Sequence, residues 1–147
     1  MFTMGSLFKD LLAKVAVKLT TVTNGNTVTT GTNIIDCLNV DRVLLAFWTG
    51  TITDGDYALS VAQGDESNLS DYAGNAIVED TDTNGDLPAF TADSDDDKVL
   101  TVEILPRKRY IRVDITQSNG SSGGIFGCLA FLHRVRNPVN SDVNADV

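Results

Sequence analysis

The stretch Arg42–Ala62 reads RVLLAFWTGTITDGDYALSVA, and it decides the fold class of this chain. Its first part, Arg42–Thr49, is apolar on both faces, which is typical of a strand inside a sheet rather than at its edge. Thr53–Asp56 is a turn signal, because an Asp-Gly pair adopts positive φ at low cost. Tyr57–Ala62 then alternates, with every second side chain apolar and large. The stretch therefore predicts two strands joined by a tight turn.

Further short strands are predicted on both sides of this stretch. Apolar runs alternate with residues rich in Thr, Asn and Gly, as in β-sandwiches and barrels. The turn signals are Asn24–Asn26 and the Gly/Ser-rich segment 117–124, QSNGSSGG. The expected strands are Val15–Thr23, Asn33–Leu38, Val99–Leu105, Arg109–Thr116 and Ile125–His133. We therefore predict an all-β fold, with a single β-sandwich-like domain over residues 14–134.

Length, composition and charge exclude several classes of protein. A chain of 147 residues is long enough for one domain, and 42% hydrophobic residues with a mean hydropathy near zero indicate a folded core. The longest uninterrupted apolar run, Val43–Trp48, is far shorter than the ~20 residues that a membrane helix needs. The net charge of -9 repels phosphates, so neither nucleic acid nor a membrane is expected as a partner.

The two ends of the chain are predicted to lie outside the sandwich. Residues 1–13 favour a short N-terminal helix or an arm, with Ser6 as the N-cap. Two interpretations of the apolar stripe in this segment stay open: it covers the edge of the domain's own core, or it docks on a neighbouring subunit. Residues 135–147 are predicted to form a flexible tail. The candidate interface residues of the N-terminal segment are Phe2, Leu7, Phe8, Leu11 and Leu12.

Catalysis is not predicted. Cys37 and Cys128 each lie in apolar surroundings, which favours two small buried hydrophobes, with one buried disulfide as the alternative. The single histidine, His133, ends an apolar strand and is interpreted as a structural or interface residue. Since no constellation of acid, base and nucleophile is recognisable, we expect a protein that is not an enzyme and that has no cofactor, calcium being the one alternative.

The acidic segment 79–97 contains the start of a calcium-loop pattern. Oxygen-bearing side chains alternate and a glycine follows them, as in the first half of such a loop. Position twelve is Thr91 rather than the usual glutamate, so an exposed acidic loop without a ligand is the alternative. The candidate calcium ligands are Asp80, Asp82, Asn84 and Asp86.

More than half of the 11 Lys and Arg residues lie close to the ends of the last predicted strands. Pairing of the last two strands around residues 117–124 would bring these cations opposite one another, where like charges repel. Such a cluster needs a negative neighbour, which is either the chain's own segment 79–97 or an acidic surface of another protein. The candidate interface residues of this cluster are Arg107, Arg109, Arg134 and Arg136.

Several blocks of the sequence resemble small structural proteins of tailed bacteriophages. The resemblance covers roughly residues 14–138, and it rests on strands and turns in a fixed order rather than on a catalytic signature. It implies a β-sandwich component of the virion. The blocks are GTITDGDY at Gly50–Tyr57, ALSVAQGDE at Ala58–Glu66, KRYIRV at Lys108–Val113 and GIFGCLAFL at Gly124–Leu132, followed by Asn137 and Pro138.

The resemblance implies a capsid decoration or cement protein that binds and stabilises the assembled head shell. The implied partner is the major capsid protein, and the implied location is the surface of the virion head, assembled in the host cytoplasm. A head–tail connector or tail-tube component is the alternative. A calcium- or carbohydrate-binding module, with Tyr57 and Tyr72 as exposed aromatics, is the second alternative. Symmetry makes a homo-oligomer the expected state.

Overall fold

The computed structural model describes residues 11–23, 27–29, 33–71, 77–78, 87–91 and 94–134, with the backbone alone for 27–29, 77–78 and 134. The described residues form strands and turns but no helix, and therefore no helix that could span a membrane. The strands are β1 (Leu11–Val22), β2 (Thr27–Thr29), β3 (Ile35–Asp36), β4 (Val40–Ile52), β5 (Asp56–Gly64), β6 (Ile77–Val78), β7 (Ala89–Thr91), β8 (Val99–Leu105), β9 (Tyr110–Ser118) and β10 (Gly124–Arg134). The predicted all-β fold is confirmed.

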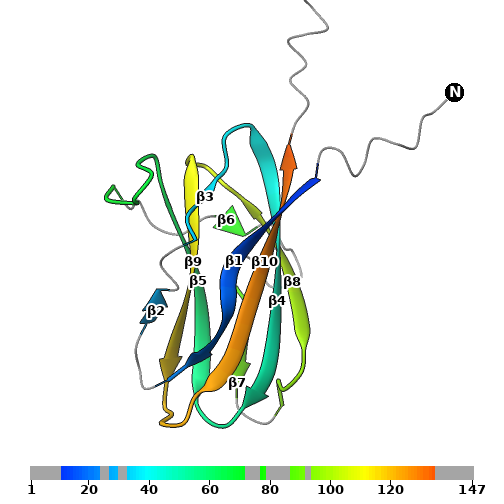
Figure 1. Ribbon diagram of the computed structural model, residues 1–147, viewed down its shortest axis with the longest axis vertical. Coiled ribbons are helices and arrows are strands. Elements are labelled where there is room, and N and C mark those ends of the chain that lie inside the picture. Colours follow the sequence, from blue (N-terminus) through cyan, green and yellow to red (C-terminus); the bar gives the residue numbers. More distant parts are fainter. Residues whose placement is uncertain are drawn as a thin grey trace, which may run out of the picture.

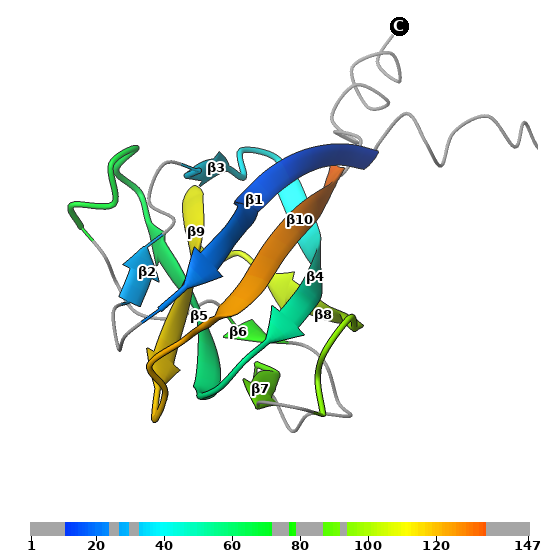
Figure 2. The same cartoon turned by 60° about the horizontal axis from the view of Figure 1, so that its bottom comes forward.

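The strands form two antiparallel sheets that pack face to face (Figures 1 and 2). Sheet A has the strand order β1-β10-β4-β8-β6. Sheet B has the order β2-β9-β5-β7, and β3 pairs with β9 as well. The turn after β4 therefore carries the chain from sheet A to sheet B instead of closing a hairpin. This arrangement confirms the predicted β-sandwich-like domain.

Four aromatic side chains connect the two sheets in the core. Sheet A contributes Phe47 and Phe126, and sheet B contributes Tyr57 and Phe90. The ring centroids of Tyr57 and Phe126 are 4.4 Å apart, and those of Phe90 and Phe126 are 5.6 Å apart. Such pairs contribute about 0.5–1.5 kcal/mol each beyond the burial of their area. The cluster therefore joins the sheets where β7 packs against β5.

The first described strand differs from the sequence-based expectation. Leu11–Ala13 were expected in a helix or arm, but they are extended and pair with His133, Leu132 and Phe131 of β10. The helical expectation is wrong for these residues. β1 pairs with β10 without interruption from Leu11 to Val15, and the register then shifts between Val15 and Val17 and again between Val17 and Thr20. β-Branched residues such as Val15 and Val17 favour the extended geometry. The other residues of the N-terminal interface prediction (Phe2, Leu7 and Phe8) and the tail 135–147 lie outside the described residues.

The crossover from β9 to β10 is organised by Asp54, which lies in the turn between β4 and β5. Its carboxylate accepts hydrogen bonds from the backbone N–H groups of Ser121, Gly123 and Ser122, each at 2.9 Å. These three residues lie in the loop that leads from sheet B back to sheet A. The three backbone donors hold the pKa of Asp54 down at about 2. One carboxylate thus ties together two of the connections between the sheets.

Asp54→Asn will lower the melting temperature of the protein, and the loss will depend on pH. The folded pKa of about 2 lies below the ~3.9 of an aspartate in an unfolded chain. The stabilisation by the carboxylate is therefore complete above about pH 4 and disappears as the pH falls toward 2. Thermal unfolding followed by circular dichroism at pH 6, 4 and 3 will show a gap between variant and wild type that narrows with acid.

Asp97→Asn is the matched control for this charge removal. Asp97 is exposed and already has a positive φ of 51°, which asparagine tolerates. Its melting temperature will stay close to that of the wild type. A gap between Asp54→Asn and wild type that stays constant from pH 6 to pH 3 would contradict the role given to the carboxylate.

Candidate functional site

Strand β4 has two apolar sides, and only one of them is covered. Val43, Leu45 and Phe47 are buried in the core between the sheets. Leu44 and Trp48 point to the opposite side of sheet A and remain partly exposed. The predicted central position is confirmed, because β4 lies between β10 and β8. Among the described residues, however, no third layer packs over its outer side.

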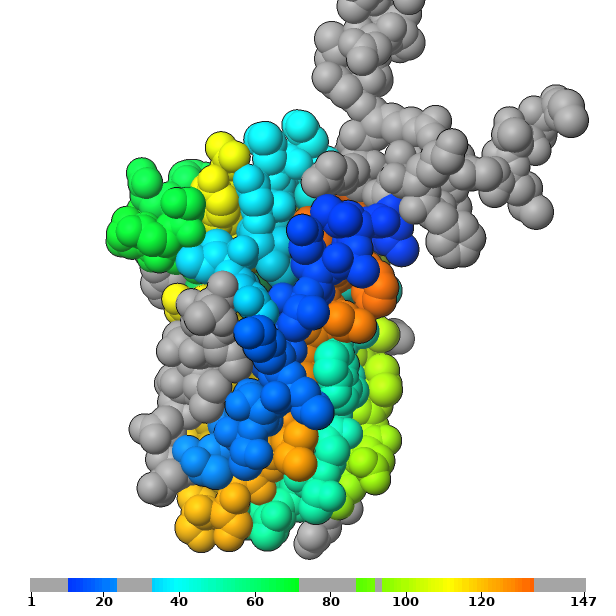
Figure 3. Space-filling model, in the orientation of Figure 1, coloured from blue at the N-terminus to red at the C-terminus, as the bar shows by residue number. Residues whose placement is uncertain are grey.

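The outer side of sheet A forms an exposed apolar face. The register places Phe131 beside Leu44 and Leu129 beside Ala46, so apolar side chains of β10 and β4 lie next to one another in rows. On one side β1 extends these rows with Ala13 and Val15, whereas on the other side β8 adds only Val99, beside Trp48. Figure 3 shows β1, β10, β4 and β8 side by side. The outer apolar face comprises Leu11, Ala13, Val15, Leu44, Ala46, Trp48, Val99, Ile125, Leu129 and Phe131.

Two glycines shape the middle of this face. Gly127 is the register partner of Trp48, and a Cβ at Gly127 would overlap the indole ring. A Cβ at Gly50 would come within 3.3 Å of Ile125. Each large side chain therefore lies over a neighbouring strand at the point where that strand has no side chain. This arrangement spreads the apolar side chains along the sheet.

The size of the outer apolar face is that of an interaction site. Val99 is 67% exposed, Val15 47% and Leu44 41%. At a strand spacing of ~4.8 Å and a two-residue repeat of ~6.8 Å, the side chains of the face named above have a footprint of roughly 330 Å². Contiguous apolar patches of this size on a monomer commonly have a binding function. We therefore regard this face as the candidate functional site.

Charged residues of opposite sign border the face at its two edges. On β1, Lys18 is exposed. On the β8 side lie the carboxylate of Glu103 and, in the loop before β8, the exposed Asp96 and Asp97. Charges on the rim of an apolar contact set the orientation of a partner and suppress wrong partners. The charges along the two edges therefore favour one orientation of a docked partner over the reverse one.

A groove of about 320 Å³ opens at one end of the face, and β1, β10, β4 and β8 all contribute to it. Arg42 crosses from β4 toward β8, where its Nη1 atom donates to Glu103 Oε1 at 2.8 Å. His133, which the sequence indicated as a structural or interface residue, lines the same groove. The groove thus combines apolar side chains with an ion pair and a histidine. Its lining residues are Leu11, Arg42, Leu44, Glu103, Phe131 and His133.

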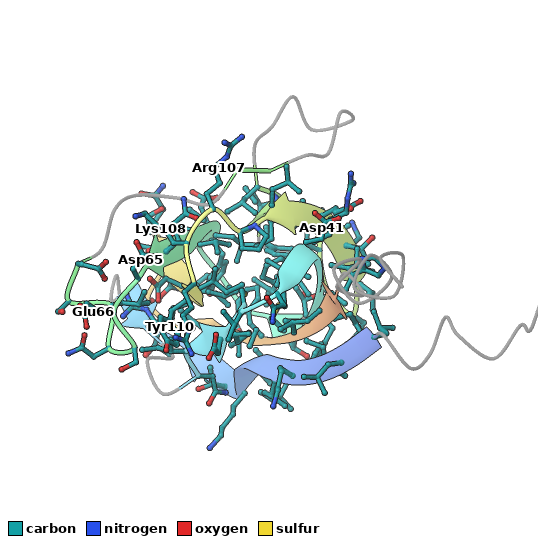
Figure 4. All side chains as sticks on the ribbon, turned by 90° about the horizontal axis from the view of Figure 1, so that it is seen from above. Asp41, Asp65, Glu66, Arg107, Lys108 and Tyr110 are labelled. Atoms are coloured by element: carbon teal, nitrogen blue, oxygen red, sulfur yellow. The ribbon has the colours of Figure 1, made fainter. Side chains whose placement is uncertain are left out.

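Part of the predicted basic cluster is paired with carboxylates at the end of the sandwich that Figure 4 views from above. Arg109 donates to both carboxylate oxygens of Asp36, at 3.1 and 2.9 Å, and its guanidinium lies 5.0 Å from the ring centre of Tyr110. Lys108 contacts Asp65 at 2.5 Å, and this bond lowers the pKa of Asp65. Figure 4 shows these two side chains together. Such exposed pairs contribute little to stability, so their main effect is local order.

The expected pairing of the last two strands is wrong. β9 lies in sheet B and β10 in sheet A, so Arg107 and Arg109 do not face Arg134 across a hairpin. Among the described residues, the negative neighbours of Lys108 and Arg109 are Asp65 and Asp36. Much of segment 79–97 lies outside the described residues, so pairing of the cluster with that segment stays a prediction. The side chain of Arg107 points away from the domain (Figure 4). Arg136 and the side chain of Arg134 lie outside the described residues.

The predicted calcium ligands also lie outside the described residues, and calcium binding stays a prediction. The residues concerned are Asp80, Asp82, Asn84 and Asp86. Of the same segment, the structure describes Thr91, whose N–H donates to Asp95 at 2.8 Å. Within the described ranges, no group of three or more His, Cys, Asp or Glu residues could hold a metal ion.

The cysteines and one aromatic residue occupy positions that the sequence leaves ambiguous. Cys37 and Cys128 are free and buried, as the favoured interpretation had it, and they do not form the alternative disulfide. Burial raises the pKa of the Cys37 thiol to about 12 and raises that of Cys128 as well. Tyr57, expected as an exposed aromatic of a carbohydrate site, is buried, and its hydroxyl donates to the carbonyl of Asp54 at 2.8 Å. That expectation is wrong.

The sequence analysis missed the outer apolar face, although a signal for it exists. Val43–Trp48 is apolar at every position, and a two-layer sandwich can bury only one side of a strand. The other side then has to be exposed or covered by a partner. The groove cannot be recognised from the sequence pattern alone, because its lining residues come from four separate strands.

The chain matches no protein-family model and no curated protein.

Gly127→Ala will destabilise the protein, because the new methyl group displaces the Trp48 ring from its place over β10. Overpacking of this kind costs about 1–3 kcal/mol. Trp48 is the only tryptophan, so its emission reports directly on this contact and will shift to longer wavelength. Gly50→Ala is the matched control, with a smaller effect, since its methyl group would meet Ile125 at 3.3 Å. Equal melting temperatures for Gly127→Ala and wild type would refute the packing described.

The buried thiols will not react in the folded protein. Thiol reagents attack the thiolate, and burial keeps Cys37 and Cys128 protonated and shielded. With Ellman's reagent at pH 8 the native protein will release no colour within minutes, and the protein in concentrated guanidinium will release two equivalents. Leu38→Cys, at a position that is 54% exposed, is the positive control. Rapid labelling of either native cysteine would show that this part of the core opens readily.

Proposed function

We propose that this protein is a structural component of a phage virion, most simply a capsid decoration or cement protein that binds the assembled head shell. The observation that carries the proposal is the outer apolar face of sheet A, which an acidic β-sandwich leaves uncovered among its described residues. The resemblance of the sequence blocks to small tailed-phage structural proteins supplies the virion context. The major capsid protein is the proposed partner.

The size of the face supports binding to a repeated lattice. Stable dimers of proteins bury about 800 Å² per partner, and the footprint of roughly 330 Å² is less than half of that. A single contact of this size is weak. Many copies on neighbouring capsomers add their contacts and stabilise the lattice, because they bind the assembled shell and not its dissociated subunits.

The proposal assigns no chemical step to the chain. Its thiols are buried and protonated, and its one histidine lies on the rim of an apolar groove. Binding by shape and apolar contact requires only a stable scaffold and an exposed face. The net charge of -9 keeps such a scaffold soluble before assembly.

Val15→Asp and Val99→Asp will each weaken binding to the shell by about tenfold or more, since each buries a charge in an apolar contact. Both positions are well exposed, at 47% and 67%, so the variants will fold with an unchanged circular dichroism spectrum. The measurement is co-sedimentation with assembled heads that lack this protein, from the phage whose genome encodes it.

Ala58→Asp is the matched control, because it adds the same charge at an exposed position on β5 of sheet B. Its binding will equal that of the wild type. Cryo-electron microscopy of the particle then gives the copy number. Hundreds of copies over the shell support decoration, a single ring at one vertex supports the connector or tail-tube alternative, and absence from the particle refutes the virion proposal.

A further inference from the structure

The groove at the end of the outer apolar face differs from the rest of that face. Elsewhere the face is shallow, because Trp48 lies over Gly127 instead of standing up from the sheet. In the groove, about 320 Å³ is open between side chains of four strands. Its apolar lining comes from Leu11, Leu44 and Phe131, of which the first two are each 41% exposed. The groove can therefore receive a side chain that projects from a partner.

The charges around the groove favour a basic partner over a second copy of this chain. Arg42 lies between two carboxylates, at 2.8 Å from Glu103 and 3.7 Å from Asp41. Within the groove lining the charges of Arg42 and Glu103 balance each other, and Asp41, which is not part of the lining, adds one negative charge next to Arg42. The whole chain carries -9, so two copies repel each other while a basic segment is attracted.

The volume of the groove favours a single side chain over a free small molecule. Small-molecule sites measure about 300–1,000 Å³ and enclose most of the ligand, usually with several converging polar groups. This groove is at the lower limit of that range and lies on the outside of a sheet. An anchoring aromatic or large aliphatic residue in a pocket is, by contrast, the usual centre of a protein–protein contact.

We infer that the groove is the anchor point of the outer apolar face, and that it takes one bulky apolar side chain from a segment of the partner protein that carries lysine or arginine beside it. This inference rests on the proposed function for the face as a whole. The apolar side chain packs against Leu44 and Phe131. The basic neighbour pairs with Glu103, whose carboxylate then bridges it and Arg42.

The test uses the full chain and short capped peptides as probes. The probe is Gly-Lys-Phe-Lys-Gly, with Gly-Lys-Ser-Lys-Gly and Gly-Glu-Phe-Glu-Gly as controls, and the readout is the nuclear magnetic resonance signal of the Leu11 and Leu44 methyl groups. The Lys-Phe peptide will shift both signals in a saturable way. The Lys-Ser peptide will not, and the Glu-Phe peptide will bind several-fold more weakly.

Variants of the chain distinguish the contribution of the apolar anchor from that of the ion pair with the basic neighbour. Leu44→Ala will weaken binding of the Lys-Phe peptide by about tenfold, the scale of a lost anchor contact. Glu103→Gln will weaken it by roughly two- to fivefold, the scale of an exposed ion pair. Leu38→Ala, at an exposed position outside the outer apolar face, is the matched control and will leave binding unchanged.

Several results would overturn the inference. They are an absence of shifts at Leu11 and Leu44, equal shifts with the Lys-Ser peptide, or a Glu103→Gln variant that binds like wild type. Without peptide, shifts that grow with protein concentration would assign the groove to a second copy. Contacts of Leu44 with Phe8 would assign it to the chain's own N-terminal residues. Either result would give the groove an occupant other than a basic partner protein and would overturn the inference.

The outcome is independent of the shell experiment, so the two proposals can fail separately. Peptide binding in the groove without any binding to heads would refute the virion function and leave the groove as a recognition site. Binding to heads that Leu44→Ala and Glu103→Gln leave unchanged, with no peptide binding, would keep the proposed function and refute the anchor.

Discussion

The two-residue repeat of β4, held between β10 and β8, is the constraint on which the rest of this structure depends. Because successive side chains of a strand point to opposite sides, a strand that is apolar throughout offers two apolar sides. The sandwich uses one of them for its core, where Phe47 meets Phe90 of the other sheet with ring centroids 6.5 Å apart. The register with β10 then lines up the other side with Leu129 and Phe131, which produces the outer apolar face.

The connections between the sheets protect this arrangement at one end. The turn after β4 and the loop before β10 both cross from one sheet to the other, and the carboxylate of Asp54 joins them through three backbone N–H groups. The same turn places Tyr57 in the core, where its hydroxyl accepts from Gln117 at 3.0 Å and donates to the carbonyl of Asp54. Tyr57 and Gln117 both belong to sheet B, so these bonds fix the Tyr57 side chain within that sheet and against the Asp54 turn, and Gln117 Oε1 is buried without a hydrogen-bond partner.

The outer apolar face and its groove give the proposed function a physical basis. An acidic chain that exposes a contiguous apolar area gains free energy when a partner covers that area. The charges at the border of the area favour some partners and orientations over others. The apolar area of the face is modest, which suits a protein that works in many copies on a lattice. In the inferred contact, the groove binds the partner's apolar side chain and its basic neighbour at one place, where Arg42 and Glu103 lie beside the apolar lining.

The sequence by itself determined the all-β class, the central position of β4, the turn at Asp54 and the burial of both cysteines, because each of these follows from local periodicity, turn chemistry or composition. Only the tertiary structure decided the rest. Leu11 is extended because β10 supplies a pairing partner, and Arg109 lies beside Asp36 instead of facing Arg134 because β9 and β10 belong to different sheets. The groove exists for the same reason: its residues are separated along the chain, and hydrogen-bonded register between strands is what brings them together.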